Sequence, residues 1–71
     1  MQRTQVTSSS IESIGYEEDM QVLEVEFRSG EVYAYFDVPN YLFDELLASH
    51  SIGAAFHTAI RNGNYHFEKI T

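Results

Sequence analysis

Two alternating stretches joined by a glycine-containing turn constrain the fold of this chain most strongly. Apolar and acidic residues alternate over Met20–Arg28, and β-branched and aromatic residues follow over Glu31–Val38. An alternation with a period of two is typical of a strand that buries one face. Ser29-Gly30 lies between the two stretches, and glycine tolerates the positive φ that a tight turn requires. The sequence therefore predicts a β-hairpin.

The length of the turn sets which residues face each other across this hairpin. A two-residue turn places Glu26 opposite Tyr33 and Glu24 opposite Tyr35. One face then collects only apolar residues, namely Leu23, Val25, Phe27, Val32, Ala34 and Phe36. We expect this face to be the core, and we expect Tyr33 and Tyr35 to share the other face with Glu24 and Glu26.

One strand before the hairpin and one at the end of the chain complete the predicted sheet. Ile11–Tyr16 suits the first strand, and Tyr65–Ile70 alternates as the last one. Glu17-Glu18-Asp19 is a polar turn between the first strand and the hairpin.

Two helices are predicted between the hairpin and the last strand. Pro39 presets the φ of a first helical turn, and the helix should run to about Ala48. Ser51 is a good N-cap for a second helix, which Asn62-Gly63 ends. We therefore expect an α+β domain of order β-β-β-α-α-β, with a small antiparallel sheet and two helices packed on one of its faces.

The length of the chain suits a single domain with a modest core. We expect one domain over residues 1–71, in which residues 1–10 form a polar leader. The sequence has no cysteine, so disulfides cannot reinforce the core, and either a monomer or a homodimer fits this size.

The charge of the chain is strongly acidic. Eleven Asp and Glu residues against four Lys and Arg residues give a formal net charge of −7. Such a chain repels a phosphate backbone and lacks the basic surface that non-specific nucleic-acid binding needs. No apolar run is long enough for a signal peptide or a membrane span, so we expect a cytoplasmic location without membrane contact.

No catalytic motif or metal-ligand spacing is visible. The serines cluster in the polar leader, and the acidic residues are scattered as on a solvated face. His50, His57 and His66 lack the spacing of metal ligands. We therefore expect a protein that is not an enzyme and that uses no metal or cofactor.

Several blocks, in order along the chain, resemble the KTSC domain family. They are Ser8-Ser9-Ser10-Ile11, Ser13-Ile14-Gly15-Tyr16, Leu23–Phe27 and Val32–Pro39, followed by Ser51, Gly53, Phe56, Ile60-Arg61, Tyr65, Phe67 and Ile70. The resemblance spans roughly residues 6–70. It implies a small bacterial or phage-type domain that also occurs at the C-terminus of some lysyl-tRNA synthetases, with Tyr33-Ala34-Tyr35 as its signature. The chain departs from the family's pattern in its less basic closing segment and at His57, where asparagine is common.

Four residues are the candidates for a binding site, namely Tyr33, Tyr35, Arg61 and Tyr65. Our first hypothesis is a non-catalytic interaction module that binds a protein partner through the face of Tyr33 and Tyr35. The alternative, which the family resemblance implies, is RNA or small-nucleotide binding, with the tyrosines stacking on bases and Arg61 contacting phosphate.

A structural role for the same residues is the competing interpretation. The tail's Tyr65 and Phe67, or the leader, can cover the two tyrosine rings as ordinary packing. Arg61 can equally serve the negative end of the second helix.

Overall fold

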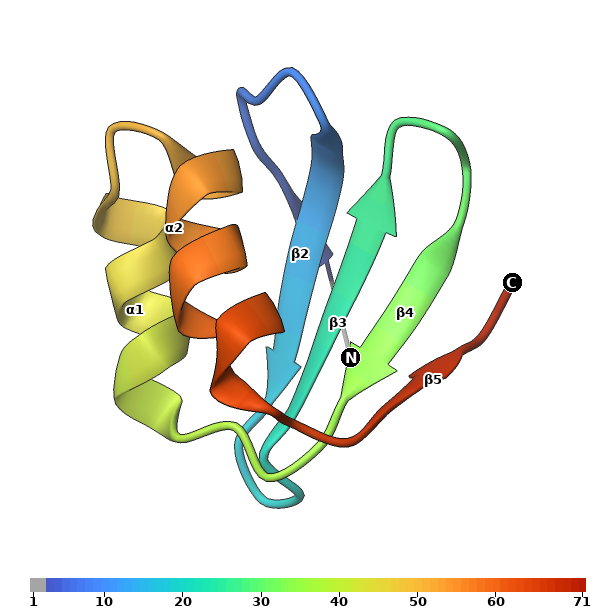
Figure 1. The fold of residues 1–71 in the computed structure, drawn as a ribbon, viewed down its shortest axis with the longest axis vertical. Coiled ribbons are helices and arrows are strands. Elements are labelled where there is room, and N and C mark those ends of the chain that lie inside the picture. The colour runs from blue at the N-terminus through green and yellow to red at the C-terminus, as the bar shows by residue number, and fades with distance from the viewer. Residues whose placement is uncertain (1–2) are drawn as a thin grey trace.

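A five-stranded antiparallel sheet with two helices on one face makes up residues 3–71, the part of the chain that the computed structural model describes (Figure 1). The strands, in both chain and spatial order, are β1 (Arg3–Gln5), β2 (Ile11–Glu17), β3 (Val22–Phe27), β4 (Val32–Tyr35) and β5 (Phe67–Lys69). The helices are α1 (Asn40–Ala48) and α2 (Ile52–Ala59), followed by the 3-10 turn η1 (Arg61–Gly63). The predicted α+β class, the antiparallel sheet and the two helices on one face are confirmed.

The structure adds one strand to the predicted order. Within the segment predicted as a polar leader, β1 pairs antiparallel with β2, so that Arg3 faces Gly15 and Gln5 faces Ser13. The three residues of β1 are all exposed. A short strand with no buried side chain carries no apolar alternation, so the sequence pattern does not reveal it.

The turn between β3 and β4 contains three residues instead of the predicted two. The Phe27 N–H donates to the Glu31 carbonyl at 2.8 Å, and the Gly30 N–H donates to the Phe27 carbonyl at 2.9 Å. Arg28 therefore belongs to the loop together with Ser29 and Gly30. Gly30 has a φ of 97°, and a left-handed residue at the last loop position is what a three-residue hairpin requires.

The longer turn moves the two tyrosines to the other face of the sheet. Val25 faces Tyr33 and Leu23 faces Tyr35, one residue away from the predicted register. The prediction that the tyrosines share a face with the glutamates of β3 is therefore wrong. Tyr35 lies in the core at 4% exposure, and Tyr33 is half-buried and packs against the core. The two tyrosine rings supply apolar surface to the core face of the sheet, because each ring is largely hydrocarbon.

Val32 and Ala34, which we assigned to the core face, lie instead on the open face with Glu24 and Glu26. They are nonetheless buried, and β4 has a paired strand on each side. Phe36, also assigned to the core face, lies beyond the end of β4, where its ring is 5.4 Å from the His66 ring.

The core lies between the sheet and the helices. Its buried members come from both layers and are Ile11, Ile14, Leu23, Val25, Tyr35, Val38, Leu42, Leu46, Ile52, Phe56 and Ile60. The helical members are spaced four residues apart, which gives each helix one apolar stripe facing the sheet. No helix within residues 3–71 is long and apolar enough to cross a membrane.

Candidate functional site

The end of α2 turns the chain so that Arg61 and Tyr65 lie next to the sheet. The Ile60 N–H still bonds to the Phe56 carbonyl at 2.9 Å, and the chain then tightens into η1. Asn64 follows with a φ of 60°, in the left-handed region, and reverses the direction of the chain toward β5. Asparagine tolerates this conformation better than most side chains do.

Gly63 leaves room for the ring of Tyr65. A Cβ atom at Gly63 would lie 2.5 Å from Cε2 of the Tyr65 ring, which is shorter than any contact a real Cβ makes. The absence of a side chain at this position therefore allows the half-buried Tyr65 ring to lie against η1.

Aromatic rings from β3, β4, β5 and α2 form one connected cluster. The rings of Tyr33 and Tyr35 stack at a centroid distance of 6.4 Å, and Phe67 lies 5.8 and 5.5 Å from them. Phe27 meets Tyr33 edge-on at 5.8 Å, and Phe56 meets Tyr35 edge-on at 5.4 Å. These edge-on and offset arrangements are the favourable ones for aromatic pairs. The tail does flank both tyrosines, as the structural interpretation predicts, but Phe67 remains 53% exposed.

All four predicted binding residues line one pocket. This pocket has a volume of about 500 Å³ and is lined by Tyr33, Tyr35, Ile60, Arg61, Asn64, Tyr65 and Phe67. We call it the tyrosine pocket. It lies between β4 and β5 on one side and the end of α2 with η1 on the other.

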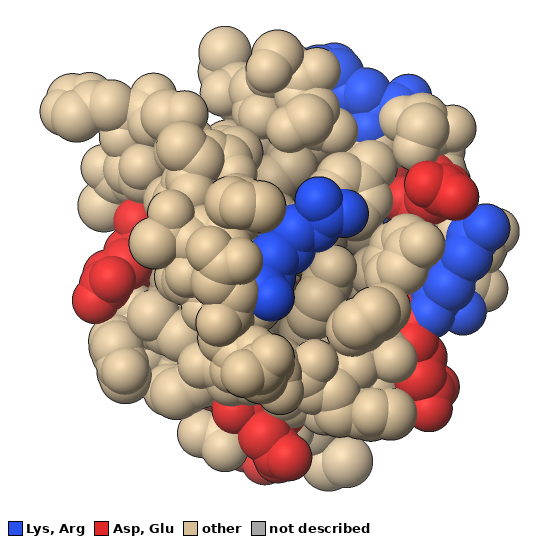
Figure 2. Space-filling model, viewed as in Figure 1, with Lys and Arg blue, Asp and Glu red and all other residues tan. Residues whose placement is uncertain are grey.

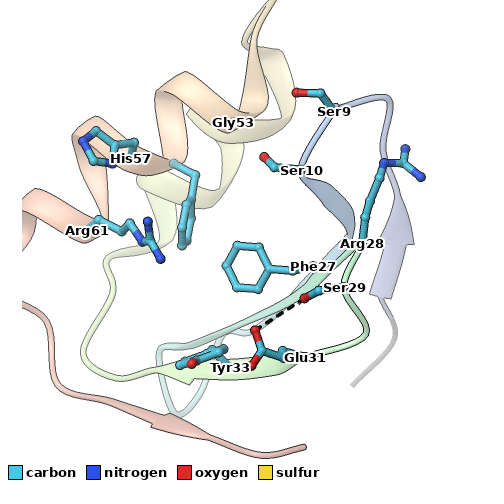
Figure 3. Close-up of a pocket in the computed structure, with 11 residues that line it drawn as sticks. Ser9, Ser10, Phe27, Arg28, Ser29, Glu31, Tyr33, Gly53, His57 and Arg61 are labelled. Carbon is cyan, nitrogen blue, oxygen red and sulfur yellow. Dashed lines mark hydrogen bonds between the residues drawn. The ribbon is translucent and has the colours of Figure 1, made fainter.

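A second pocket adjoins the first and shares Tyr33 and Arg61 with it. Its volume is about 580 Å³, and its other lining residues are Ser9, Ser10, Phe27, Arg28, Ser29, Glu31, Gly53, Phe56 and His57. We call it the serine pocket, and we call the two together the groove. Figure 3 shows the Phe27 ring in the middle of the serine pocket, with α2 on one side and β4 on the other.

The serine run forms part of the groove wall, which the sequence reasoning missed. A Cβ at Gly53 would lie 3.1 Å from the Ser10 hydroxyl oxygen and 3.4 Å from that of Ser8, so the run packs closely on α2. The Ser8 hydroxyl also accepts hydrogen bonds from the N–H groups of Ser10 and Ile11 at 3.2 and 3.3 Å. The only sequence signal for this contact was that Ser8 to Ile11 and Gly53 belong to the blocks shared with the family.

Arg61 differs from the other cations of residues 3–71 in having no carboxylate partner within 4.0 Å. The other three each pair with one, Arg3 with Glu24 at 2.7 Å, Arg28 with Glu12 at 2.8 Å and Lys69 with Glu31 at 3.2 Å. Figure 2 shows a basic side chain at the centre of this face of the molecule, with the acidic side chains toward its margins. The groove therefore offers one positive charge that forms no ion pair with a described carboxylate.

The guanidinium of Arg61 points into the groove above Tyr33, whereas Arg28 and His57 point away from it (Figure 3). Arg28 instead donates to the Ser8 carbonyl at 2.6 Å. Burial raises the pKa of Tyr35 above the usual value of 10.0, and the nearby Arg61 charge offsets part of that rise. No group of three His, Asp or Glu side chains within residues 3–71 is arranged to hold a metal ion.

The fold and the groove define a small α+β domain with an aromatic cleft and an arginine pointing into it. The family model for the KTSC domain matches residues 7–65, and the chain belongs to this family. A crystal structure of a KTSC domain protein from Yersinia pestis is similar to this chain with a TM-score of 0.93 at 37% identity, covering 99% of this chain and 97% of that one.

The domain occurs in two kinds of relative. An uncharacterised protein of Stutzerimonas stutzeri is 39% identical over 70 residues, which is 99% of both chains. A lysine–tRNA ligase of Nostoc punctiforme is 38% identical over 63 residues, covering 89% of this chain but only 11% of that enzyme. The family thus contains both small proteins and a short part of a larger enzyme.

Proposed function

We propose that this domain is a non-catalytic interaction module and that its groove binds a short segment of a protein partner. The observation that carries the proposal is Arg61, which has no carboxylate partner within residues 3–71 and points into a groove floored by aromatic rings. Aromatic side chains and arginine are the residues that most often anchor protein interfaces. Arg61 can bind a carboxylate through two parallel hydrogen bonds while the rings contact an apolar side chain.

Charge and ring exposure favour a protein over an extended RNA. Arg61 is the one cation of the groove without a described carboxylate partner, in a chain of net charge −7, whereas an RNA strand brings one phosphate with every nucleotide. Tyr35 is 4% exposed and stacks on Tyr33, so its faces are already used within the protein. A base-stacking platform needs ring faces open to solvent.

RNA or nucleotide binding is the second candidate, and two observations favour it. Glu24 and Glu26 lie on the face opposite the tyrosines, so these two acids do not line the groove. Relatives of the domain also include lysine–tRNA ligases, whose name indicates a tRNA substrate. In this candidate, Arg61 contacts a phosphate and the half-buried rings of Tyr33 and Tyr65 contact a base.

Selection of peptides from a random displayed library tests the proposal and requires no candidate partner. We expect the protein to enrich peptides whose binding is weakened about 10- to 100-fold by Arg61→Gln, because a charge-assisted pair is lost. Arg3→Gln is the matched control, since it removes the same charge from the open face of the sheet. Enriched peptides that bind both variants equally well would place the interaction outside the groove.

Titration with short single-stranded oligoribonucleotides decides between the two candidates. Sub-micromolar binding that falls steeply with salt and requires Arg61 would favour RNA.

We also propose that the protein is located in the cytoplasm, which is a prediction from the sequence.

A further inference from the structure

Arg61 and Tyr33 lie at the boundary between two pockets of similar size. Both residues line the tyrosine pocket of about 500 Å³ and the serine pocket of about 580 Å³. A ligand group bound to Arg61 therefore has one pocket on each side of it.

The groove runs along β4. Glu31, which precedes β4, lines the serine pocket, Tyr33 lines both pockets, and Tyr35 lines the tyrosine pocket. These three residues are spaced by two along the chain, so their side chains point to the same face. Successive positions of the groove are therefore about 7 Å apart, which is the rise of two residues in a strand.

Both pockets have aromatic rings in their lining. Arg61 belongs to both, and the serine pocket is also lined by Arg28 and Glu31, which pair with Glu12 and Lys69. The tyrosine pocket is lined by the rings of Tyr35, Tyr65 and Phe67 together with Ile60. The serine pocket has the rings of Phe27 and Phe56 at its centre, with serine hydroxyls on its rim. Apolar or aromatic groups suit both pockets.

We propose that the ligand is an extended peptide segment with an acidic residue at its centre and an apolar or aromatic residue two positions away on each side. The central carboxylate binds Arg61, and the two flanking side chains enter the tyrosine pocket and the serine pocket. An extended peptide that lies in the groove over β4 has the same repeat of about 7 Å between side chains that point the same way. This inference rests on the proposed function, because it names the kind of protein segment that the groove accepts.

Three synthetic peptides of equal length test the inference by fluorescence anisotropy with the full chain. The first contains Leu-Ser-Glu-Ser-Leu, the second contains the rearranged Leu-Glu-Ser-Ser-Leu, and the third contains Leu-Ser-Gln-Ser-Leu. We expect the first peptide to bind at least about tenfold more tightly than the other two, because only it offers the carboxylate and both apolar groups in register. This comparison uses the unaltered protein, so it does not depend on the folding of a variant.

Arg61→Gln provides the second measurement. It should abolish the preference for the Glu peptide over the Gln peptide, whereas Arg3→Gln should preserve that preference. The result would identify Arg61 as the group that reads the central carboxylate.

Other results separate this inference from the proposed function. Equal binding of the first two peptides, both weakened by Arg61→Gln, would overturn the spacing and leave the protein-binding groove intact. Failure of all three peptides, while library-selected peptides still require Arg61, would overturn the spacing in the same way. Arg61-dependent binding of a dinucleotide and of no peptide would overturn both.

Discussion

The two faces of the sheet carry different chemistry, and the difference sets the groove apart from the rest of the sheet. The helix-covered face presents aliphatic and aromatic side chains, and its margin opens into the groove. The open face carries paired polar groups, including the ion pair of Arg3 with Glu24 and the 2.8 Å hydrogen bond from Ser13 to Glu26. These polar groups of the open face therefore already have hydrogen-bond or ionic partners within the protein. The positive charge of Arg61 and the accessible rings meet instead where the helices leave the sheet.

Replacing one residue on each face should give the largest contrast. We expect Tyr35→Ala to lower the free energy of unfolding by about 3–5 kcal/mol, because it removes a buried ring from the core. Glu24→Ala on the open face should cost only about 0.2–1 kcal/mol. Urea denaturation followed by circular dichroism measures both values. Similar losses for the two variants would show that the faces do not differ as described.

Gly63→Ala should give the next largest effect, because the new methyl group collides with the Tyr65 ring. We expect a loss of about 1–3 kcal/mol, typical of forcing extra volume into a packed site. The double variant with Tyr65→Ala should recover part of the loss, because the ring that causes the collision is gone. Additive losses in the double variant would mean that the two residues do not interact.

The pH dependence of stability should report on the burial of Tyr35. Its pKa is raised in the folded protein, so folding retains the proton that the unfolded chain loses near pH 10, and stability falls as pH rises above about 10. Tyr35→Phe should flatten this alkaline decline. Part of the decline should remain, since burial also raises the pKa of Tyr16.

Carbon-13 labelling of the tyrosine rings separates the titrations of these two residues by NMR. Arg61→Gln should raise the pKa of Tyr35 further, because the positive charge that favours the phenolate is removed. The titration of Tyr16 should not move in this variant, which makes Tyr16 the internal reference. An unchanged Tyr35 pKa would mean that Arg61 does not act on the buried ring.

Arg3→Gln should produce the smallest effect. The ion pair with Glu24 is partly exposed, so its loss should cost about 0.2–1 kcal/mol in low salt and less in high salt. Peptide binding in the groove should not change. A loss of binding as large as that of Arg61→Gln would indicate that net charge, and not the groove, controls recognition.

The sequence predicted the elements of this fold better than their pairing. Both helices begin where Pro39 and Ser51 predicted, and a period of 3.6 marks their buried sides, although the Ser51 side chain makes no capping hydrogen bond. The α2 helix ends at Ala59, and a 3-10 turn occupies Arg61–Gly63, which includes the predicted stop. The hairpin was also predicted, but its register was not. Over Val32–Tyr35 both alternate faces are apolar, so a shift by one residue changes no obvious polarity. A positive φ at Gly30 fits either turn length, so the glycine does not fix the register by itself.

The four predicted binding residues come together in the tyrosine pocket because the turn has three residues, which the sequence pattern did not predict. Tyr33 and Tyr35 were assigned to the opposite face, yet the register shift turned them toward Arg61 and Tyr65. The serine wall escaped prediction because Ser10 and Gly53 are far apart in the sequence and their contact needs no charge or period. The residue types suggested the four candidates, whereas the contacts among them depended on the length of the turn.

The position of β5 in the chain has a consequence for how the groove is held together. β1 to β4 follow one another directly along the chain, whereas both helices lie between β4 and β5 in the sequence. The outer wall of the groove is held by the pairing of β5 with β4 and by backbone bonds at its two ends, such as Ile70 N–H to the Val32 carbonyl at 2.7 Å and Phe36 N–H to the His66 carbonyl at 2.9 Å. We expect the amide hydrogens of this exposed edge strand to exchange faster than those of the inner strands. A ligand held between Arg61 and Phe67 would join this segment to α2, so slower exchange at Ile70 and Phe36 would register occupancy of the groove even when no side chain is labelled.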